Sequence, residues 1–327
     1  MPMGLANLDS NSYSTFTSIF RSISPSPEPR DTAILTQSGS VSSALYLAGR
    51  QMGVRFNFSL NTGNEACIEY AEYLEYLADR DDTKVVVGYL ESIRDRDRFK
   101  KIAIRFRNEK RPIIMLKAGV TAKGKQITAA HTAAISGNKG DDAALFAEAG
   151  VITAVDIAHA ADLAYLARFK ARTSGARVAI FTNSGAIAAL MADIFVVSGL
   201  DINDFSSEIQ KKLRSGVPPY GMVFNPVDFT GNIVNNHQFG PEAIQLVLES
   251  GEADFAVLYA SGFLIDRMAD GLIDVTKKRE NLISIISTGV VVRQADLEDA
   301  GIPVFDDLGR GTRAISSYIL WKEGGSG

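Results

Sequence analysis

A repeated segment limits what this 327-residue chain can fold into more than any other feature of its sequence. Residues 33–54 read AILTQSGSVSSALYLAGRQMGV, and residues 179–200 read AIFTNSGAIAALMADIFVVSGL. Each copy has a short apolar strand, then Thr, an amide residue and Ser-Gly, and then a helical pattern that ends near Gly. We therefore predict two similar domains, one after the other along the chain.

Short apolar runs that alternate with helical patterns follow each copy of the repeat. The stretch 95–106 (DRDRFKKIAIRF) shows the helical pattern, because its apolar residues recur every three or four positions. Strands that alternate with helices predict parallel sheets covered on both faces, so we expect an α/β fold of two doubly wound, parallel-sheet domains. The apolar runs expected as strands are 56–60, 84–90, 112–119, 254–259, 282–287 and 303–305.

Polar stretches with Pro, Ser or Gly mark the expected domain limits. The stretch SISPSPEPR ends at residue 30, so residues 1–30 are expected to form an N-terminal arm or linker. The polar turn ARTSGAR at 171–177 is expected to separate a first domain, 31–173, from a second domain, 177–323. The final GGSG is expected to be flexible.

Composition excludes several classes of protein. The chain has 34 basic and 38 acidic residues and no basic stripe, so neither nucleic acid nor an anionic membrane is an expected partner. The single cysteine, Cys67, cannot form an internal disulfide, and the N-terminus lacks the pattern of a signal peptide, so we expect a cytoplasmic protein. The most apolar stretch, 185–200, contains Asp193 and predicts a buried helix rather than a membrane span. No His or Cys cluster has the spacing of metal ligands, so no protein-bound metal is expected.

In both copies of the repeat, Ser-Gly lies where a strand turns into a helix. Ligands of doubly wound sheets bind at the carboxyl ends of the strands, and the first-turn N–H groups of a helix attract anions. We therefore predict that Ser38 and Gly39 bind phosphate, and that Ser184 and Gly185 bind the same phosphate from the opposite side. The alternative is that each serine only caps its helix.

One histidine, His131, lies in a long stretch of small and polar residues, 118–139, which predicts a mobile functional loop. A neutral imidazole is nucleophilic near pH 7, so we predict transient phosphorylation of His131. Glu91 directly follows the strand 84–90, and its carboxylate is expected to hold the other N–H of the imidazole ring. The alternatives are a histidine without chemistry and an ordinary loop acid.

Three further polar residues lie at or after expected strand ends, and two more lie in the motif NPVD. Each has a plainer interpretation, as a surface lysine, a loop residue or part of a turn, since Asn-Pro starts turns and Asp caps helices. His159 and His237 match no motif and are expected to be structural or surface residues. The candidate substrate-binding residues are Asn64, Glu65, Lys117, Asn225 and Asp228.

The motifs ILTQSGSV, SLNTGNEACIEYAEYLEYLADRDDTKVVVGYLESI, RPIIMLKAG and AAHTAAISGNKG, in this order, resemble a ligase domain of the nucleoside-diphosphate-forming acyl-CoA synthetases. This superfamily includes succinyl-CoA synthetase. The sequence IFTNSGAIAALMAD followed by NPVDFTG is similar to the second ligase domain of the same enzymes. The resemblance covers about residues 33 to 323 and implies that both domains are flavodoxin-like.

The resemblance implies a reversible reaction, in which acyl-CoA, phosphate and a nucleoside diphosphate give a carboxylic acid, CoA and a nucleoside triphosphate. An acyl phosphate passes its phosphoryl group to a histidine, which matches His131, and from there to ADP or GDP. Glu91 matches the carboxylate that orients the histidine. The turns at Ser38–Gly39–Ser40 and at Ser184–Gly185 match the helix ends that hold the phosphoryl group.

The resemblance also implies partners that the sequence lacks. The family uses a CoA-binding Rossmann domain and an ATP-grasp subunit or domain, with Mg²⁺ bound together with the nucleotide, and an oligomer is expected. MGLANL at the start resembles the tail of the CoA-binding domain, so the chain is expected to be incomplete as an enzyme. The family's Ser-His-Thr-Gly reads Ala-His-Thr-Ala here, with Ala130 and Ala133 as departures. A non-catalytic scaffold or regulatory homologue and a two-domain small-molecule binding protein are the alternatives.

Overall fold

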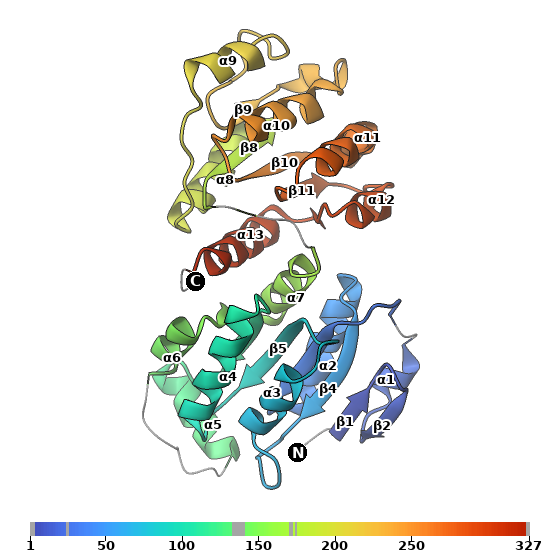
Figure 1. Cartoon of the computed structure of the whole chain (residues 1–327), viewed down its shortest axis with the longest axis vertical. Helices are drawn as coiled ribbons and strands as arrows, with labels where there is room; N and C mark the ends of the chain where they lie inside the picture. The colour runs from blue at the N-terminus through green and yellow to red at the C-terminus, as the bar shows by residue number, and fades with distance from the viewer. Residues whose placement is uncertain (1–3, 24–25, 133–140, 170–172, 174, 325–327) are drawn as a thin grey trace. The chain divides into compact units, whose positions relative to one another are not determined.

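A computed structural model of the chain describes residues 4–23, 26–132, 141–169, 173 and 175–324. Its contacts divide the chain into two compact units, which Figure 1 shows. Unit 1 comprises Met1–Arg168 with Gly324–Gly327, and unit 2 comprises Phe169–Glu323.

Unit 1 is built on a seven-stranded sheet with the order β2-β1-β4-β3-β5-β6-β7. The five strands from β3 to β7 are parallel, and along the chain their order is second, first, third, fourth, fifth, which is the flavodoxin-like order. The predicted doubly wound fold is therefore confirmed for this unit. The strands are β3 (Thr32–Thr36), β4 (Phe56–Asn61), β5 (Val85–Leu90), β6 (Ile113–Lys117) and β7 (Ile152–Ala154).

Helices cover both faces of this sheet. Ala33 and Leu35 of β3 share a core with three helices on one face, whereas Ile34 between them is buried against the other face. The apolar stripe predicted in 95–106 is confirmed, since its residues from Phe99 to Phe106 at helical spacing are buried. The first face holds α3 (Tyr70–Ala78), α4 (Arg96–Asn108) and α6 (Asp142–Ala149), and the other holds the contacting pair α2 (Gly39–Gln51) and α7 (Ile157–Leu166).

The segment expected to form an N-terminal arm adds two strands to the edge of the sheet. Strand β1 (Gly4–Asn7) pairs antiparallel with β4 on one side and with β2 (Ser12–Thr15) on the other. The short helix α1 (Ile19–Ser22) follows, and its Phe20 packs edge-on against Tyr46 of α2. The sheet is therefore mixed at this edge and parallel elsewhere.

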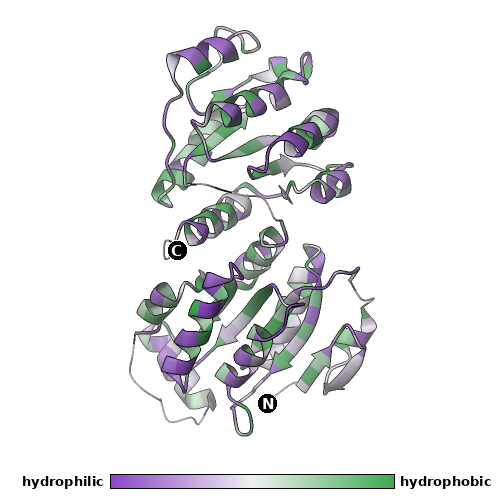
Figure 2. Cartoon of the chain, in the orientation of Figure 1, coloured by the Kyte–Doolittle hydropathy of each residue, from purple (hydrophilic) through white to green (hydrophobic). Residues whose placement is uncertain are grey.

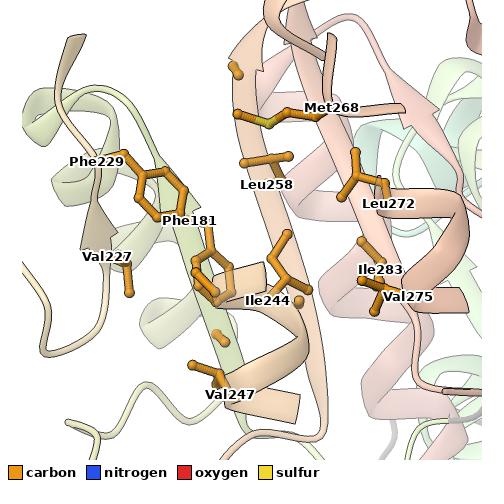
Figure 3. Packing of buried hydrophobic residues seen from close by; sticks show 14 of the residues in the cluster. Phe181, Val227, Phe229, Ile244, Val247, Leu258, Met268, Leu272, Val275 and Ile283 are labelled. Carbon is orange, nitrogen blue, oxygen red and sulfur yellow. The ribbon is translucent and has the colours of Figure 1, made fainter. Parts of the chain in front are cut away.

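Unit 2 repeats the same arrangement on a five-stranded parallel sheet with the order β12-β11-β10-β8-β9, again flavodoxin-like. Figure 3 shows Phe181 of β8 and Leu258 of β10 packed against Ile244 and Val247 of α10 in its core. The strands are β8 (Val178–Thr182), β9 (Val227–Asp228), β10 (Phe255–Ser261), β11 (Ile283–Thr288) and β12 (Val304–Phe305). The helices are α8 (Gly185–Val197), α9 (Ser207–Leu213), η1 (Gly231–Val234), α10 (Phe239–Ser250), α11 (Gly262–Lys278), α12 (Gln294–Asp299) and α13 (Leu308–Lys322).

Helix α8 corrects one expectation about the most apolar stretch. Met191 and Phe195 are buried, as expected, but Leu190 is 52% exposed and Val197 is 88% exposed. Helix α8 therefore buries one side and exposes apolar side chains on the other. Figure 2 shows apolar residues, in green, along the strands of both sheets. In the described ranges, no helix is both long enough and apolar enough to span a membrane.

A second correction concerns the expected loop at 118–139. Its residues from Ala122 to Thr132 form helix α5, which begins after a turn at Gly119. Ala, Lys and Gln have high helix propensity, but the segment lacks an apolar stripe, and the sequence pattern therefore did not reveal a helix. Residues 133–140 lie outside the described part of the chain.

Candidate functional site

The strand order of unit 1 creates a switch point between β3 and β5. The connections that leave these neighbouring strands run to opposite faces of the sheet, which opens a crevice at their carboxyl ends. Gln37 and Ser38 follow β3, and Glu91 follows β5. The sequence-predicted turn and the sequence-predicted carboxylate therefore lie at one switch point.

Gln37 joins the two sides of the switch point through its side-chain amide. Its Oε1 accepts hydrogen bonds from the backbone N–H of Glu91 at 2.6 Å and of Ser92 at 3.1 Å. Its Nε2 donates to the carbonyl of Ser92 at 2.8 Å and to Oε1 of Glu65 at 2.5 Å. The segment that carries Glu91 is thus fixed to the end of β3. Gln37 is not among the predicted site residues, although an amide residue before Ser-Gly occurs in both copies of the repeat.

Glu65 is brought to the same place as a buried carboxylate, only 4% exposed. Burial raises the pKa of its carboxyl above the ordinary value, and this effect outweighs the hydrogen bond from Gln37 and the charge of Arg94, which lower it. Arg94 Nε lies 3.4 Å from Oε2 of Glu65. Asn64, its neighbour, is exposed, and its carbonyl accepts a hydrogen bond from Arg94 at 2.9 Å.

Glu91 is held by two neighbours besides Gln37. The hydroxyl of Tyr89 donates to Oε1 of Glu91 at 3.2 Å, and burial together with the charge of Glu91 raises the pKa of Tyr89 to about 12. The ammonium of Lys117 donates to the carbonyl oxygens of Glu91 at 2.8 Å and of Ala118 at 2.5 Å, and it forms an ion pair with Asp142 at 3.2 Å. Lys117 therefore ties the backbone at Glu91 to the end of β6 rather than extending into solvent.

The turn at Ser38 starts helix α2 without a serine cap. The Ser38 side chain accepts no hydrogen bond from the first turn of the helix, and its Oγ lies 3.1 Å from Oγ of Ser40 instead. The N–H groups of the first turn are therefore not taken up by the serine that precedes them. An anion at this point would meet those N–H groups, the positive end of the helix dipole and two hydroxyls.

The matched turn of unit 2 also begins its helix without a serine cap, but a carboxylate lies beside it. Ser184 precedes α8, its side chain makes no cap, and its N–H donates to Oγ1 of Thr182 at 3.1 Å. A Cβ placed on Gly185 would lie 3.1 Å from Oδ2 of Asp228, while Oδ1 of Asp228 accepts from the N–H of Thr230 at 2.8 Å. A carboxylate therefore borders the helix start in unit 2.

Asn225 lies toward the opposite end of β8 from Ser184. Its Oδ1 accepts from the N–H of Ile180 at 3.1 Å, and its Nδ2 donates to the carbonyls of Val178 at 2.9 Å and Asn203 at 3.1 Å. The Asn225 amide group thus donates to two backbone carbonyls, one of them at the start of β8. The structure thus separates Asn225 from Asp228, although both lie in the motif NPVD.

His131 is the penultimate residue of α5, and its side chain lies outside the described part of the structure. Its expected contact with Glu91 stays a prediction. His159 is 3% exposed in α7, and its Nδ1 accepts a hydrogen bond from the N–H of Val155 at 3.3 Å. Among the described residues, no group of three or more His, Cys, Asp or Glu side chains could hold a metal ion.

A cavity of about 590 Å³ lies beside Glu91 in unit 1. It occupies the space between the first turns of α2 and α7, above the ends of β5, β6 and β7. Its walls are mostly apolar. The lining residues are Val41, Tyr89, Leu116, Lys117, Ala118, Ala154, Val155, Asp156, Ile157 and Ala158.

Comparison with known families matches both halves of the chain. Residues 29–167 match the succinyl-CoA ligase like flavodoxin domain, and residues 178–258 match the ligase-CoA domain. The ADP-forming acetate–CoA ligase of Methanocaldococcus jannaschii is 32% identical over 230 residues, which cover 70% of this chain and 32% of that protein. The alpha subunit of ADP-forming acetate–CoA ligase I of Pyrococcus furiosus is 29% identical over 303 residues, which cover 90% of this chain and 65% of that subunit.

Among solved structures, the chain is similar in fold to the dinucleotide forming acetyl-coenzyme A synthetase 1 of Candidatus Korarchaeum cryptofilum in complex with phosphate and ADP. The TM-score is 0.84 at 21% identity, and the match covers 98% of this chain and 70% of that one. The chain spans less than two thirds of the length of either curated relative described above.

Proposed function

We propose that this chain, which belongs by both of its domains to the nucleoside-diphosphate-forming acyl-CoA synthetases, is the ligase component that carries their phosphohistidine step. The complete enzyme converts acyl-CoA, phosphate and ADP or GDP reversibly into a carboxylic acid, CoA and ATP or GTP. The observation that carries the proposal is the link between the uncapped turn at Ser38 and the carboxylate of Glu91 through Gln37 at one switch point.

In the proposed step, the free nitrogen of the His131 imidazole attacks the phosphorus of an acyl phosphate. The bond between nitrogen and phosphorus forms while the bond between phosphorus and the acyl oxygen breaks, and the carboxylate leaves with the electron pair. The imidazole gains positive charge in the attack, and the Glu91 carboxylate stabilises that charge by accepting the N–H of the other ring nitrogen. Transfer to the nucleoside diphosphate reverses the same changes at phosphorus.

The two turns supply charge stabilisation rather than acid or base groups. First-turn N–H groups at Gly39 and Ser40, and those after Ser184 and Gly185, suit the oxygens of a transferring phosphoryl group. Phosphoryl transfer depends mainly on positioning and on such stabilisation, so a protein-bound metal is not required in this chain. Mg²⁺ accompanies the nucleotide on the partner.

The partners follow from the same proposal. CoA is held by a Rossmann-type CoA-binding domain, and the nucleotide is held by an ATP-grasp domain or subunit, in a cytoplasmic oligomer. The curated relatives are named as ADP-forming, which favours ADP as the nucleotide acceptor here. The acid is a small carboxylic acid, and Asn64, Glu65 and Lys117 lie at or just after strand ends of unit 1, whereas Asp228 ends β9 in unit 2.

The test is to incubate the chain together with its nucleotide-binding partner and ATP labelled at the γ-phosphate. We expect an acid-labile, base-stable label on the protein. His131→Ala should abolish the label, since removing a residue that acts covalently costs about a thousandfold or more. The matched control His237→Ala should keep it. Full labelling and full acyl-CoA formation in His131→Ala would exclude the phosphohistidine function and favour a scaffold, which the departures at Ala130 and Ala133 would then explain.

A further inference from the structure

We infer that the cavity beside Tyr89 is the site that selects the acyl group, and that it takes the apolar chain of a monocarboxylic acid. The inference rests on the proposed function, because it places the acyl part of the acyl phosphate whose phosphoryl part lies at the turn of Ser38. The position, lining and charge of the cavity each support it.

The position of the cavity connects it to both proposed phosphoryl-transfer groups. Val41, on its wall, directly follows Ser40 in the first turn of α2. Tyr89, on another wall, donates its hydroxyl hydrogen to Glu91 at 3.2 Å. An acyl phosphate whose phosphoryl group lies at the turn would reach the cavity by extending its acyl chain past Val41.

The lining of the cavity favours hydrocarbon over polar groups. Leu116 and Ala154 are buried on the sheet side, and Val41, Ala118 and Ile157 surround the space above them. The volume of about 590 Å³ lies in the range of sites for small organic ligands and far exceeds what an acetyl group fills. Each methylene that becomes buried there should strengthen binding about fourfold.

The charges around the cavity oppose a second carboxylate on the substrate. Lys117 is its one cationic lining residue, and the ammonium is already shared among two carbonyls and Asp142. Asp156 adds a negative charge at the rim, where Oδ1 accepts the N–H of His159 at 2.7 Å. A dicarboxylic acid would bring a second anion next to Asp156, and among the described lining residues only Lys117 carries a positive charge.

The test measures kcat/KM of the complete enzyme for acetate, 3-methylbutanoate, phenylacetate and succinate. We expect 3-methylbutanoate to exceed acetate by about tenfold or more, given about fourfold for each added carbon, and succinate to be poorest. Ala154→Phe fills the cavity, so it should lower kcat/KM for the two larger acids more than for acetate and thereby remove the preference for them. Labelling of His131 by ATP should be unchanged in this variant.

Two further variants keep the result interpretable. Ala158→Phe narrows the exposed rim without entering the sheet and should also penalise the larger acids, so it decides the case if Ala154→Phe does not fold. Ala189→Phe, on the exposed side of α8, is the matched control and should leave all four acids unchanged. Normal labelling with unchanged acid preference in both cavity variants, or a wild-type preference for succinate, would overturn the cavity inference alone. Absence of labelling in the wild-type enzyme would instead overturn the proposed function.

Discussion

Units 1 and 2 place different side chains around the same helix start. In unit 1, Gln37 connects the end of β3 to the segment that carries Glu91 and to the buried Glu65. In unit 2, the matched residue is Asn183, and its side chain forms no hydrogen bond within the part of the chain that the structure describes. Instead, Asp228 borders the turn at Gly185.

The difference separates what the fold supplies from what the loops add. A strand followed by an uncapped Ser-Gly helix start recurs in both units, so the anion-attracting geometry comes with the repeated frame. The carboxylate that could orient a histidine occurs at the switch point of unit 1, where unit 2 has Ser261 at the end of β10. We therefore expect unit 1 to carry the covalent chemistry and unit 2 to assist it.

The largest effect is expected from removing the charge of the switch-point carboxylate. Glu91→Gln retains an oxygen that can accept from Tyr89, so the fold should persist, but labelling of His131 should slow about a hundredfold. Ser261→Ala, at the corresponding strand end of unit 2, should change labelling less than about twofold. Labelling rates from γ-labelled ATP measure both. Equal rates for Glu91→Gln and wild type would contradict the orienting role of Glu91.

The next effect concerns the amide residues before the two turns. Gln37→Ala removes one hydrogen bond to Glu65 and the acceptor of two backbone N–H groups, so the free energy of unfolding of unit 1 should fall by about 1–3 kcal/mol. Asn183→Ala should change the stability of unit 2 by less than about 0.5 kcal/mol. Urea unfolding of the full chain provides the measurement. Equal losses in the two variants would show that the amides serve the same purpose in both units.

A smaller effect should appear in the binding of inorganic phosphate to the two turns. The carboxylate of Asp228 lies against the helix start at Gly185 and should repel an anion there, so we expect phosphate to shift the amide NMR signals of the turn at Gly39 at lower concentration. Asp228→Asn should strengthen binding at Gly185 about two- to fivefold, in line with a dipole-scale interaction. Chloride at the same ionic strength serves as the control. If both turns of the wild-type chain were saturated at the same phosphate concentration, the expected difference in their phosphate affinities would be refuted.

The smallest effect is a pair of opposite pH dependences. Burial raises the pKa of Glu65, so its contribution to stability is present below the unfolded value of 4.5 and is lost as pH rises through the folded pKa. Lys212 lowers the pKa of exposed Glu208, so that contribution is present above 4.5 and is lost as pH falls through the folded pKa.

The stabilities of the two matched variants, relative to wild type, should therefore change in opposite directions as pH rises. Relative to wild type, Glu65→Gln should become more stable as pH rises from about 4 to about 7, and Glu208→Gln should become less stable over the same interval. Urea unfolding across this pH range gives both slopes. Parallel slopes would show that Glu65 is not penalised by its burial.

The sequence predicted the fold well, because alternating strands and helices leave a clear pattern in apolar residues. Every apolar run expected as a strand lies on a strand of the structure. Strand β9 was missed because its two residues lie within NPVD, which favours turns on local grounds. Helix α5 was missed because its helix-forming residues show no apolar stripe.

The site was predictable only in part, because its geometry depends on contacts between distant segments. Strand ends and the Ser-Gly repeat identified Ser38 and Glu91 from local sequence alone. The role of Gln37 depends on contacts between three segments that are distant in the sequence, and local sequence patterns do not predict such contacts. The cavity is formed by side chains from several elements, so its volume and charge likewise could not be predicted from the spacing of apolar residues in the sequence.

The hairpin of β1 and β2 has a consequence for how the first domain can be isolated. The family match begins at residue 29, yet β1 covers the outer side of β4 through residues 5–7. A chain that begins at residue 29 would lack β1 and leave the six-residue strand β4, with Phe58 and Leu60, as an open edge of the sheet. Unpaired edges of this kind recruit strands from other molecules, so the trimmed domain should aggregate where the longer one stays monodisperse. The domain that the family model matches and the sheet that the structure completes therefore begin at different residues.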